Sequence, residues 1–325
     1  MTELDLTMRN VRYDRFDAHA HVSGPKSGYV DVMNALSFRG VLNIAWSDLR
    51  EPDAIAAYEA ELRRGTEAYP GRFLFCPTFN VTQYADPSYT DRVTAKLARD
   101  IDEHGAVAVK VWKDLGMMLT DPQGNYVFCD DPHFTPIFDF LTERQVVVCM
   151  HIGDPKAGWL PLEPGTPHYG YFSQHPEFHW HGRDDRPSHD AIMHHRDNLV
   201  GRYPDTTFVC AHLASLAYDI DRVAAFLDAF PNAYVDSAAR QGDLAAQPDE
   251  KVRAFFERYP DRILYGKDWV VEGAFLDVGE PERSARAQHA VRAYQREFAY
   301  YEEHLGLSSD VLEKFYYGNA ARLFG

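Results

Sequence analysis

The chain has 325 residues, a formal net charge of −16, 45% hydrophobic residues and 14% aromatic residues. This composition provides a large hydrophobic core, and the excess of negative charge disfavours binding to nucleic acid or to anionic membranes. No apolar run approaches the roughly 18 residues that a membrane-spanning helix needs, so we expect no membrane segment. The expected partner is a small-molecule substrate, because a local pocket can bind one whatever the net charge.

Two features bear on the compartment. Residues 1–10 are polar and acidic, so we expect no signal peptide there. The four cysteines form no C-x-x-C pair, and three of them lie in apolar runs that are typical of strands. We interpret Cys76, Cys129, Cys149 and Cys210 as buried free thiols in a reducing compartment, which indicates the cytoplasm.

Strand-like and helix-like runs alternate along the chain, which predicts a parallel sheet with crossover helices. Strands are expected at residues 13–19, 40–46, 72–79, 106–112, 145–151, 207–212, 233–236 and 262–266. Helices are expected near residues 29–37, 54–69, 87–103, 134–142, 189–203, 220–230, 249–259, 283–304 and 309–323. The most economical arrangement is a single (β/α)₈ TIM barrel over residues 1–325, with extra C-terminal helices.

A long insertion is expected after the fifth strand. Residues 153–187 are rich in Pro, Gly and His and show no hydrophobic period. A loop of this length in a compact domain is usually functional. We therefore interpret it as a lid-like loop over the mouth of the barrel.

Polar residues interrupt the apolar strands at their carboxyl ends, where barrel enzymes carry their chemistry. His19 and His21 are two residues apart on the first strand, so they point to the same side. Strands four, five, six and eight end near Lys110, His151, His212 and Asp268. Each of these residues alone is more typical of structural hydrogen bonding than of a ligand. Because all six meet at one end of the predicted barrel, we interpret them together as a site.

The residue types suit a metal. Three imidazoles and one carboxylate satisfy a borderline-soft divalent ion such as zinc. A water on that ion becomes a nucleophile near neutral pH, and a neighbouring carboxylate can take its proton.

The same residues lie in segments with a recognisable pattern. The segments are Asp17-Ala-His-Ala-His21, His151-Ile-Gly-Asp-Pro155, Ala211-His-Leu-Ala214, Gly266-Lys-Asp268 and Tyr317-Gly-Asn-Ala-Ala-Arg-Leu-Phe-Gly325. Together they resemble the amidohydrolase superfamily, and the last one resembles its barrel-only branch, the amidohydrolase 2 family. That branch includes aminocarboxymuconate-semialdehyde and resorcylate-type decarboxylases, and lactonases that act on aromatic breakdown products.

The resemblance implies roles for the strand-end residues. His19, His21, His151 and Asp268 would hold one divalent metal, Zn²⁺ by preference with Mn²⁺ as the alternative. His212 would polarise a substrate carbonyl or move a proton, and Asp268 would also act as general acid or base. The resemblance further implies a homo-oligomer such as a dimer.

Two lysines need separate interpretation. In binuclear relatives a lysine in the position of Lys110 is carbamylated and bridges two metals, whereas in mononuclear ones it directs a cation at a substrate carboxylate. We prefer the second interpretation, because Trp112 and Lys113 rather than further ligands follow it. Lys267 stands where the family commonly has a small residue. We expect it to lower the pKa of Asp268 or to reach a loop carboxylate.

Other residues are candidates for the substrate pocket. Trp46, Asn80 and Trp112 lie at strand ends. Arg240 follows the seventh strand, and its planar guanidinium can donate two parallel hydrogen bonds to a carboxylate. For Trp46 and Asn80 the alternative is rim packing, and for Arg240 it is a surface salt bridge.

The insertion and the helix after it add further candidates. Trp180 and His181 would face the substrate from the lid. Seven histidines gather here, and the alternatives for them are a solvated loop, a subunit contact or a second metal site. They are His168, His175, His179, His181, His189, His194 and His195.

These observations support a metal-dependent hydrolase of a small ester, lactone or amide that carries a carboxylate. The alternative on the same residues is a non-oxidative decarboxylase of an aromatic or muconate-type acid. A third possibility is a barrel without catalytic activity, against which the intact ligand positions argue.

Overall fold

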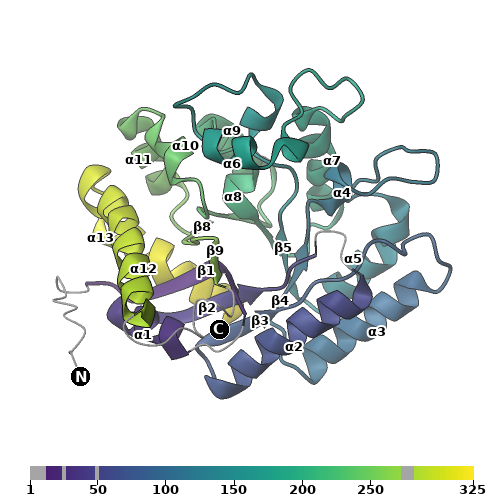
Figure 1. The fold of residues 1–325 in the computed structure, drawn as a ribbon, viewed down its shortest axis with the longest axis horizontal. Coiled ribbons are helices and arrows are strands. Elements are labelled where there is room, and N and C mark those ends of the chain that lie inside the picture. The colour runs from purple at the N-terminus through teal and green to yellow at the C-terminus, as the bar shows by residue number, and fades with distance from the viewer. Residues whose placement is uncertain (1–11, 24–26, 48–50, 272–281) are drawn as a thin grey trace.

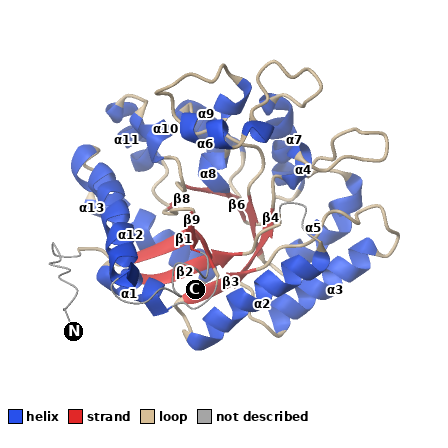
Figure 2. Ribbon diagram, in the orientation of Figure 1, coloured by secondary structure: helices blue, strands red, loops and turns tan. Residues whose placement is uncertain are grey.

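The computed structural model describes residues 12–23, 27–47, 51–271 and 282–325. The sequence-based expectation for residues 1–10 lies outside these ranges. The strands lie at the centre of the molecule and helices surround them (Figures 1 and 2). They are β1 (Arg15–Val22), β2 (Phe38–Ile44), β3 (Phe73–Cys76), β4 (Ala108–Val111), β5 (Val147–Met150), β6 (Phe208–Cys210), β7 (Ala233–Asp236), β8 (Ile263–Leu264) and β9 (Trp269–Val271).

All pairings between these strands are parallel. One sheet has the order β3-β2-β1-β9 and the other the order β4-β5-β6-β7-β8. Backbone hydrogen bonds join the sheets at one edge, where the N–H of Lys110 donates to the carbonyl of Pro77 at 2.7 Å. On the other side, the N–H of Ala18 in β1 donates to the carbonyl of Tyr265, which directly follows β8, at 2.9 Å. The strands therefore follow one another around the ring of a (β/α)₈ barrel, and the predicted fold class is confirmed.

Helices cover the outside of the ring (Figure 2). The α-helices are α1 (Ser27–Ala35), α2 (Pro52–Ala68), α3 (Tyr89–Asp102), α4 (Asp114–Met117), α5 (Thr135–Glu143), α6 (Tyr169–Gln174), α7 (His189–Arg202), α8 (Ala211–Ala214), α9 (Ile220–Ala229), α10 (Gln241–Ala245), α11 (Asp249–Arg258), α12 (Glu282–Ala299), α13 (Ser309–Glu313) and α14 (Asn319–Phe324). Helix α3 shows why they form: Tyr89, Val93 and Leu97 recur every four residues and are buried.

The C-terminal segment closes the amino-terminal side of β1 and β8. Asn319 is fully buried and its side-chain amide donates to the carbonyls of Pro260 and Ile263, each at 2.8 Å. The Arg15 guanidinium lies 4.0 Å from the ring centroid of Phe298 on α12. The closing motif of the sequence is thus structural, because it supports the strand ends opposite to the predicted site.

Three expectations need correction. Residues 153–187 include short helical segments, namely Lys156–Trp159, α6 and Pro176–Phe178, each too short to produce a hydrophobic period. Strand β6 ends at Cys210, because residues 212–215 all have positive φ and turn the chain sharply. The predicted helix 283–304 is α12 followed by a π-turn at Tyr300–His304.

The cysteines and the apolar character of the helices bear on two further expectations. All four cysteines are buried and unpaired. None of the described helices combines the length and the apolar character that crossing a bilayer requires.

Candidate metal and substrate site

The first group of site residues comes from β1 and the link between β8 and β9. The Nε2 atoms of His19 and His21 lie 3.6 and 3.5 Å from Oδ1 of Asp268. The N–H of Asp268 donates to the carbonyl of His19 at 2.7 Å, and β9 pairs with β1 directly beyond it. A Cβ on Gly266 would lie 2.9 Å from Cβ of His19, so only glycine allows the two strands to approach this closely.

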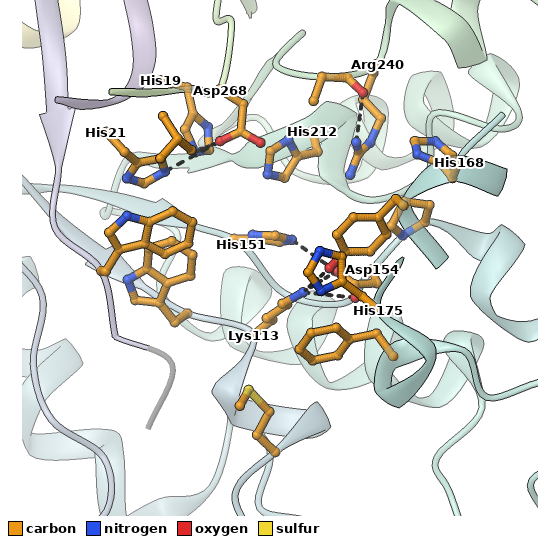
Figure 3. Close-up of a pocket in the computed structure, with 18 of the residues that line it drawn as sticks. His19, His21, Lys113, His151, Asp154, His168, His175, His212, Arg240 and Asp268 are labelled. Carbon is orange, nitrogen blue, oxygen red and sulfur yellow. Dashed lines mark hydrogen bonds and ion pairs between the residues drawn. The ribbon is translucent and has the colours of Figure 1, made fainter. Parts of the chain in front are cut away.

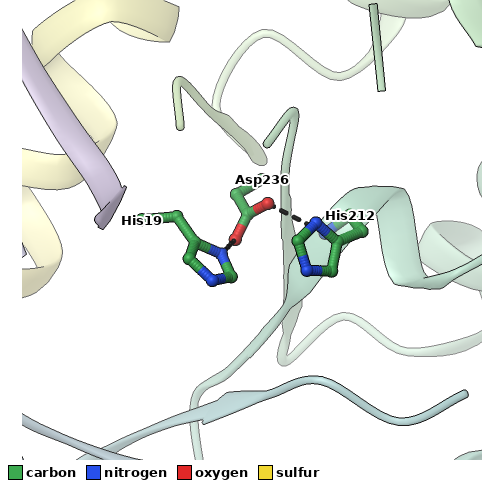
Figure 4. Close-up of side chains that lie close together, drawn as sticks. All are labelled: His19, His212 and Asp236. Atoms are coloured by element: carbon green, nitrogen blue, oxygen red, sulfur yellow. Dashed lines mark hydrogen bonds and ion pairs between the residues drawn. The ribbon is translucent and has the colours of Figure 1, made fainter. Parts of the chain in front are cut away.

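Asp236 at the end of β7 forms hydrogen bonds to His19 and His212 (Figure 4). Its Oδ2 accepts the Nδ1–H of His19 at 2.9 Å, and its Oδ1 accepts the backbone N–H of His212 at 2.8 Å. Burial opposes ionisation of Asp236, but the neighbouring His19 holds its pKa below the ordinary value. The carboxylate thereby fixes the tautomer of His19 and leaves its Nε2 lone pair free to accept, with Nζ of Lys110 at 3.4 Å and Oδ1 of Asp268 at 3.6 Å.

The other two imidazoles are held in the same way by backbone carbonyls. Nδ1 of His21 lies 2.8 Å from the carbonyl of Ile44, and Nδ1 of His212 lies 2.8 Å from that of Ala238. Nε2 of His21 is buried and has no hydrogen-bond partner within the described part of the chain. A buried lone pair beside a second imidazole and a carboxylate is what a divalent ion needs, so His19, His21 and Asp268 fit a metal.

A cavity of about 650 Å³ opens over this group (Figure 3). The rings of Trp46 and Trp112 stack 4.8 Å apart, and Trp46 also stacks on His21 at 4.2 Å. The Trp112 indole N–H donates to the carbonyl of Ala45 at 3.0 Å, which fixes the orientation of that ring. The cavity therefore has one flat aromatic wall directly beside the metal-binding group.

His151 lines the same cavity but faces a different partner. Its Nε2 lies 3.6 Å from Oδ1 of Asp154, and burial lowers its pKa to about 3. Asp154 also accepts two hydrogen bonds from Nζ of Lys113, at 2.7 and 2.9 Å. Two groups among the described residues could hold a metal, His19 with His21 and Asp268, and His19 with His212 and Asp236, and neither contains His151. Its predicted role as a fourth ligand therefore stays a prediction, which requires its ring to turn away from Asp154.

The structure places the predicted substrate-binding residues in two sets. Trp46, Trp112 and Arg240 line the cavity, together with His212. Lys110, Asn80, Trp180 and His181 are absent from the cavity wall as the structure describes it. A role in substrate contact is therefore not supported for the second set.

Physical reasons explain each of these displacements. Lys110 is fully buried below the cavity, with its Nζ 3.4 Å from Nε2 of His19, and burial lowers its pKa. Asn80 accepts the N–H and the hydroxyl of Thr82 at 3.0 and 2.8 Å. Trp180 is buried in the core, and the exposed His181 lies 3.3 Å from the carbonyl of Trp159.

The insertion forms part of the cavity wall through other residues. His168, Tyr171, His175 and Phe178 line the cavity. Lys113 connects this segment to the barrel, because its Nζ lies 3.2 Å from the Tyr171 hydroxyl and 3.9 Å from the ring centroid of Phe178.

The remaining histidines have structural partners. His189 is buried with Nε2 3.1 Å from the carbonyl of Ser215, and His195 pairs with Asp130 at 2.7 Å. No metal-binding group among the described residues includes a histidine of this region.

Lys267 corrects a further expectation. Its Nζ pairs at 2.5 Å with Glu297, a buried residue of helix α12, and not with a loop carboxylate. Its backbone N–H donates to Oδ1 of Asp17 at 3.0 Å, and that same oxygen accepts the N–H of His19. Asp17 thus connects β1 to the Asp268 link.

Sequence reasoning missed Asp236, Asp154 and Lys113 as parts of the site. Each is a charged residue at or just after a strand end, the signal that identified the other candidates. Their roles depend on partners in other elements, which no local pattern contains.

Comparison with known proteins decides the family. The amidohydrolase family model Amidohydro_2 matches residues 16–325. The chain belongs to the amidohydrolase family. No curated protein matches the sequence.

Solved structures share the fold of this amidohydrolase at low sequence identity. The 2,6-dihydroxybenzoate decarboxylase from Rhizobium is 15% identical with a TM-score of 0.60, over 96% of this chain and 98% of that one. The 5-carboxyvanillate decarboxylase from Novosphingobium aromaticivorans, in complex with manganese, is 16% identical with a TM-score of 0.57, over 100% and 99%. An uncharacterised TIM-barrel protein from Bordetella bronchiseptica is 14% identical with a TM-score of 0.55, over 95% and 98%.

The prediction of a divalent-metal site agrees with these findings. Manganese is bound in one similar structure, and the amidohydrolase described here has a His/Asp group that can hold a metal.

Proposed function

We propose that this amidohydrolase is a metal-dependent carboxy-lyase that removes CO₂ from a small planar acid. The observation that carries the proposal is the convergence of His19, His21 and Asp268 on a cavity with a flat wall of stacked Trp46 and Trp112. Stacked indoles favour a flat aromatic or conjugated ligand. Decarboxylases of aromatic acids among the similar structures support this reaction class over the hydrolysis that the sequence analysis placed first.

The residues of the chain divide the work. A divalent ion held by His19, His21 and Asp268 would supply positive charge to an anionic substrate and polarise its oxygen atoms. Trp46 and Trp112 hold the plane of the acid by stacking. His212 lies beside this group, with its ring centroid 4.8 Å from that of His19. Because its Nδ1 is bound to a carbonyl, its Nε2 is the atom that can accept or release a proton.

The proposed reaction breaks the bond between the carboxylate and the adjacent carbon. The electron pair of that bond stays on the carbon, CO₂ leaves, and the carbon takes up one proton. Asp268, a member of the metal-binding group, and His212 beside it line the cavity and can carry this proton. Solvent replaces it after each turnover.

Hydrolysis of an ester, lactone or amide is the second candidate, and one observation favours it. Burial opposes ionisation of Asp268, but the adjacent imidazoles of His21, His19 and His212 hold its pKa well below the ordinary value. An ionised carboxylate whose side chain is 28% exposed suits a base that takes a proton from an attacking water.

Product analysis distinguishes the two reactions. The chain, loaded with manganese or zinc, is incubated with hydroxybenzoates, muconate-type acids, and matched lactones and esters. We expect one of the acids to release CO₂. This release should require both the metal and Asp268. Asp268→Asn keeps the side-chain shape and should abolish release, whereas the surface control Asp102→Asn should not. Acid production from lactones or esters without CO₂ release would overturn the lyase assignment in favour of the hydrolase.

A further inference from the structure

Arg240 is a buried cation in the cavity wall, and it has no carboxylate partner in the part of the chain that the structure describes. It follows β7 and immediately precedes α10, and its exposed fraction is 6%. Nη1 donates to the carbonyl of Ala239 at 2.9 Å, whereas Nε is buried without a hydrogen-bond partner. Within the ranges that the structure describes, no Asp or Glu oxygen lies within 4.0 Å of its guanidinium.

The other charged groups of the cavity wall have partners. Lys113 pairs with Asp154 at 2.7 Å. The acid nearest to Arg240 in sequence, Asp243, pairs with His168 at 2.6 Å and is therefore not the partner of the guanidinium. Burying an unpaired guanidinium is costly, and a ligand anion that enters the cavity supplies the missing partner. The planar fork of arginine suits a carboxylate, which accepts two parallel N–H···O bonds.

The position of Arg240 adds a constraint on the ligand. Asp268, His212 and Arg240 follow one another along one side of the cavity, with His212 in the middle (Figure 3). A ligand that reaches from the metal-binding group to Arg240 therefore passes over His212. Its two ends meet positive charge, and its middle lies beside the group assigned to proton transfer.

We infer that the substrate is a planar dicarboxylic acid, with one carboxylate at the metal-binding group and the second held by Arg240. This inference rests on the proposed function, because it places the reacting carbon between the two anionic ends. It assigns to Arg240 the substrate-recognising role that the sequence analysis divided between Lys110 and Arg240. Acids that carry a single carboxylate leave the guanidinium unpaired and bind more weakly.

Binding measurements on the metal-loaded chain test the inference without any turnover. Benzoate provides one carboxylate, and phthalate, isophthalate and terephthalate provide two at increasing separation on the same ring. We expect one of the three dicarboxylates to bind wild type at least about tenfold more tightly than benzoate, the gain typical of a charge-assisted bidentate contact. If no dicarboxylate exceeds benzoate, the inference is wrong, and this comparison requires no variant.

Variants then test whether the tighter binding of the dicarboxylate depends on Arg240. Arg240→Met should remove the preference for the dicarboxylate and leave benzoate affinity unchanged, whereas Arg240→Lys should retain part of it. Arg258→Met, at an exposed arginine paired with Asp228, is the matched control and should change neither affinity. A dicarboxylate preference that survives Arg240→Met would overturn the inference.

A separate measurement of CO₂ release distinguishes the proposed carboxy-lyase function from the proposed binding of a dicarboxylate by Arg240. Tight, Arg240-dependent binding without CO₂ release from any dicarboxylate would refute the lyase while supporting the recognition role of Arg240. CO₂ release from monocarboxylates alone would support the lyase and refute the dicarboxylic substrate.

Discussion

The Nδ1–H of His19 donates to Oδ2 of Asp236 across 2.9 Å, and both side chains are almost fully buried. Oδ1 of the same carboxylate accepts the backbone N–H groups of His212 and Ala238, at 2.8 and 3.0 Å. One carboxylate thus orients a proposed metal ligand and the turn that carries a proposed proton carrier. The end of β7 thus contributes to the site through these hydrogen bonds.

Asp236→Asn should reduce metal affinity about 10- to 100-fold, as losses of partners behind metal ligands commonly do. An amide has one acceptor oxygen where the carboxylate has two, so either His19 or the two backbone N–H groups lose their acceptor. Competition against a chelating dye measures the affinity. Asp100→Asn, at a buried carboxylate that pairs with Lys96 on the outer helices, is the control. Equal affinities for the two variants would contradict the role assigned to Asp236.

His21→Ala should abolish metal binding, because it removes a buried lone pair that has no other partner in the described structure. His151→Ala separates two arrangements of the site. We propose that His151 turns from Asp154 to the metal, so its loss should lower metal affinity as well. Metal content per chain, measured by elemental analysis, decides the point. Unchanged affinity in His151→Ala would leave three protein ligands.

The pair of Lys113 and Asp154 should contribute to stability through its burial. Their side chains are only 7% and 2% exposed, so removal of one partner leaves a buried charge unpaired. Lys113→Met should lower the free energy of unfolding by about 3–5 kcal/mol. The double variant with Asp154→Asn should lose less than the sum of the single variants, as measured by urea unfolding. Additive losses would indicate that the two groups do not interact.

His189 should make stability depend on pH. Burial lowers its pKa from 6.5 to about 4, so below pH 6.5 the unfolded chain binds a proton that the folded chain does not. Stability from this group is therefore complete above pH 6.5 and falls as the pH drops towards 4, by about 3 kcal/mol at most. His189→Gln should flatten the dependence on pH in that window. An unchanged slope in urea unfolding between pH 4.5 and 7 would contradict the assignment.

The amino-acid sequence determined the architecture and the metal-binding group. Strand and helix periods are local, so the alternation alone indicates a parallel barrel. The period of two in His19-Ala-His21 places both imidazoles on one side, and the strand-end rule adds Asp268 from about 250 residues away. These inferences need no knowledge of side-chain partners.

Only the tertiary structure decided which cation lines the cavity and which groups orient the candidate metal ligands. Lys110 and Arg240 are both basic residues near strand ends, but Lys110 lies beneath His19 while Arg240 opens into the cavity. The orientation of His151 towards Asp154 and of His19 towards Asp236 likewise depends on elements far apart in sequence. A local pattern predicts which side a residue faces, whereas its partner is set by the packing of elements that meet only after folding.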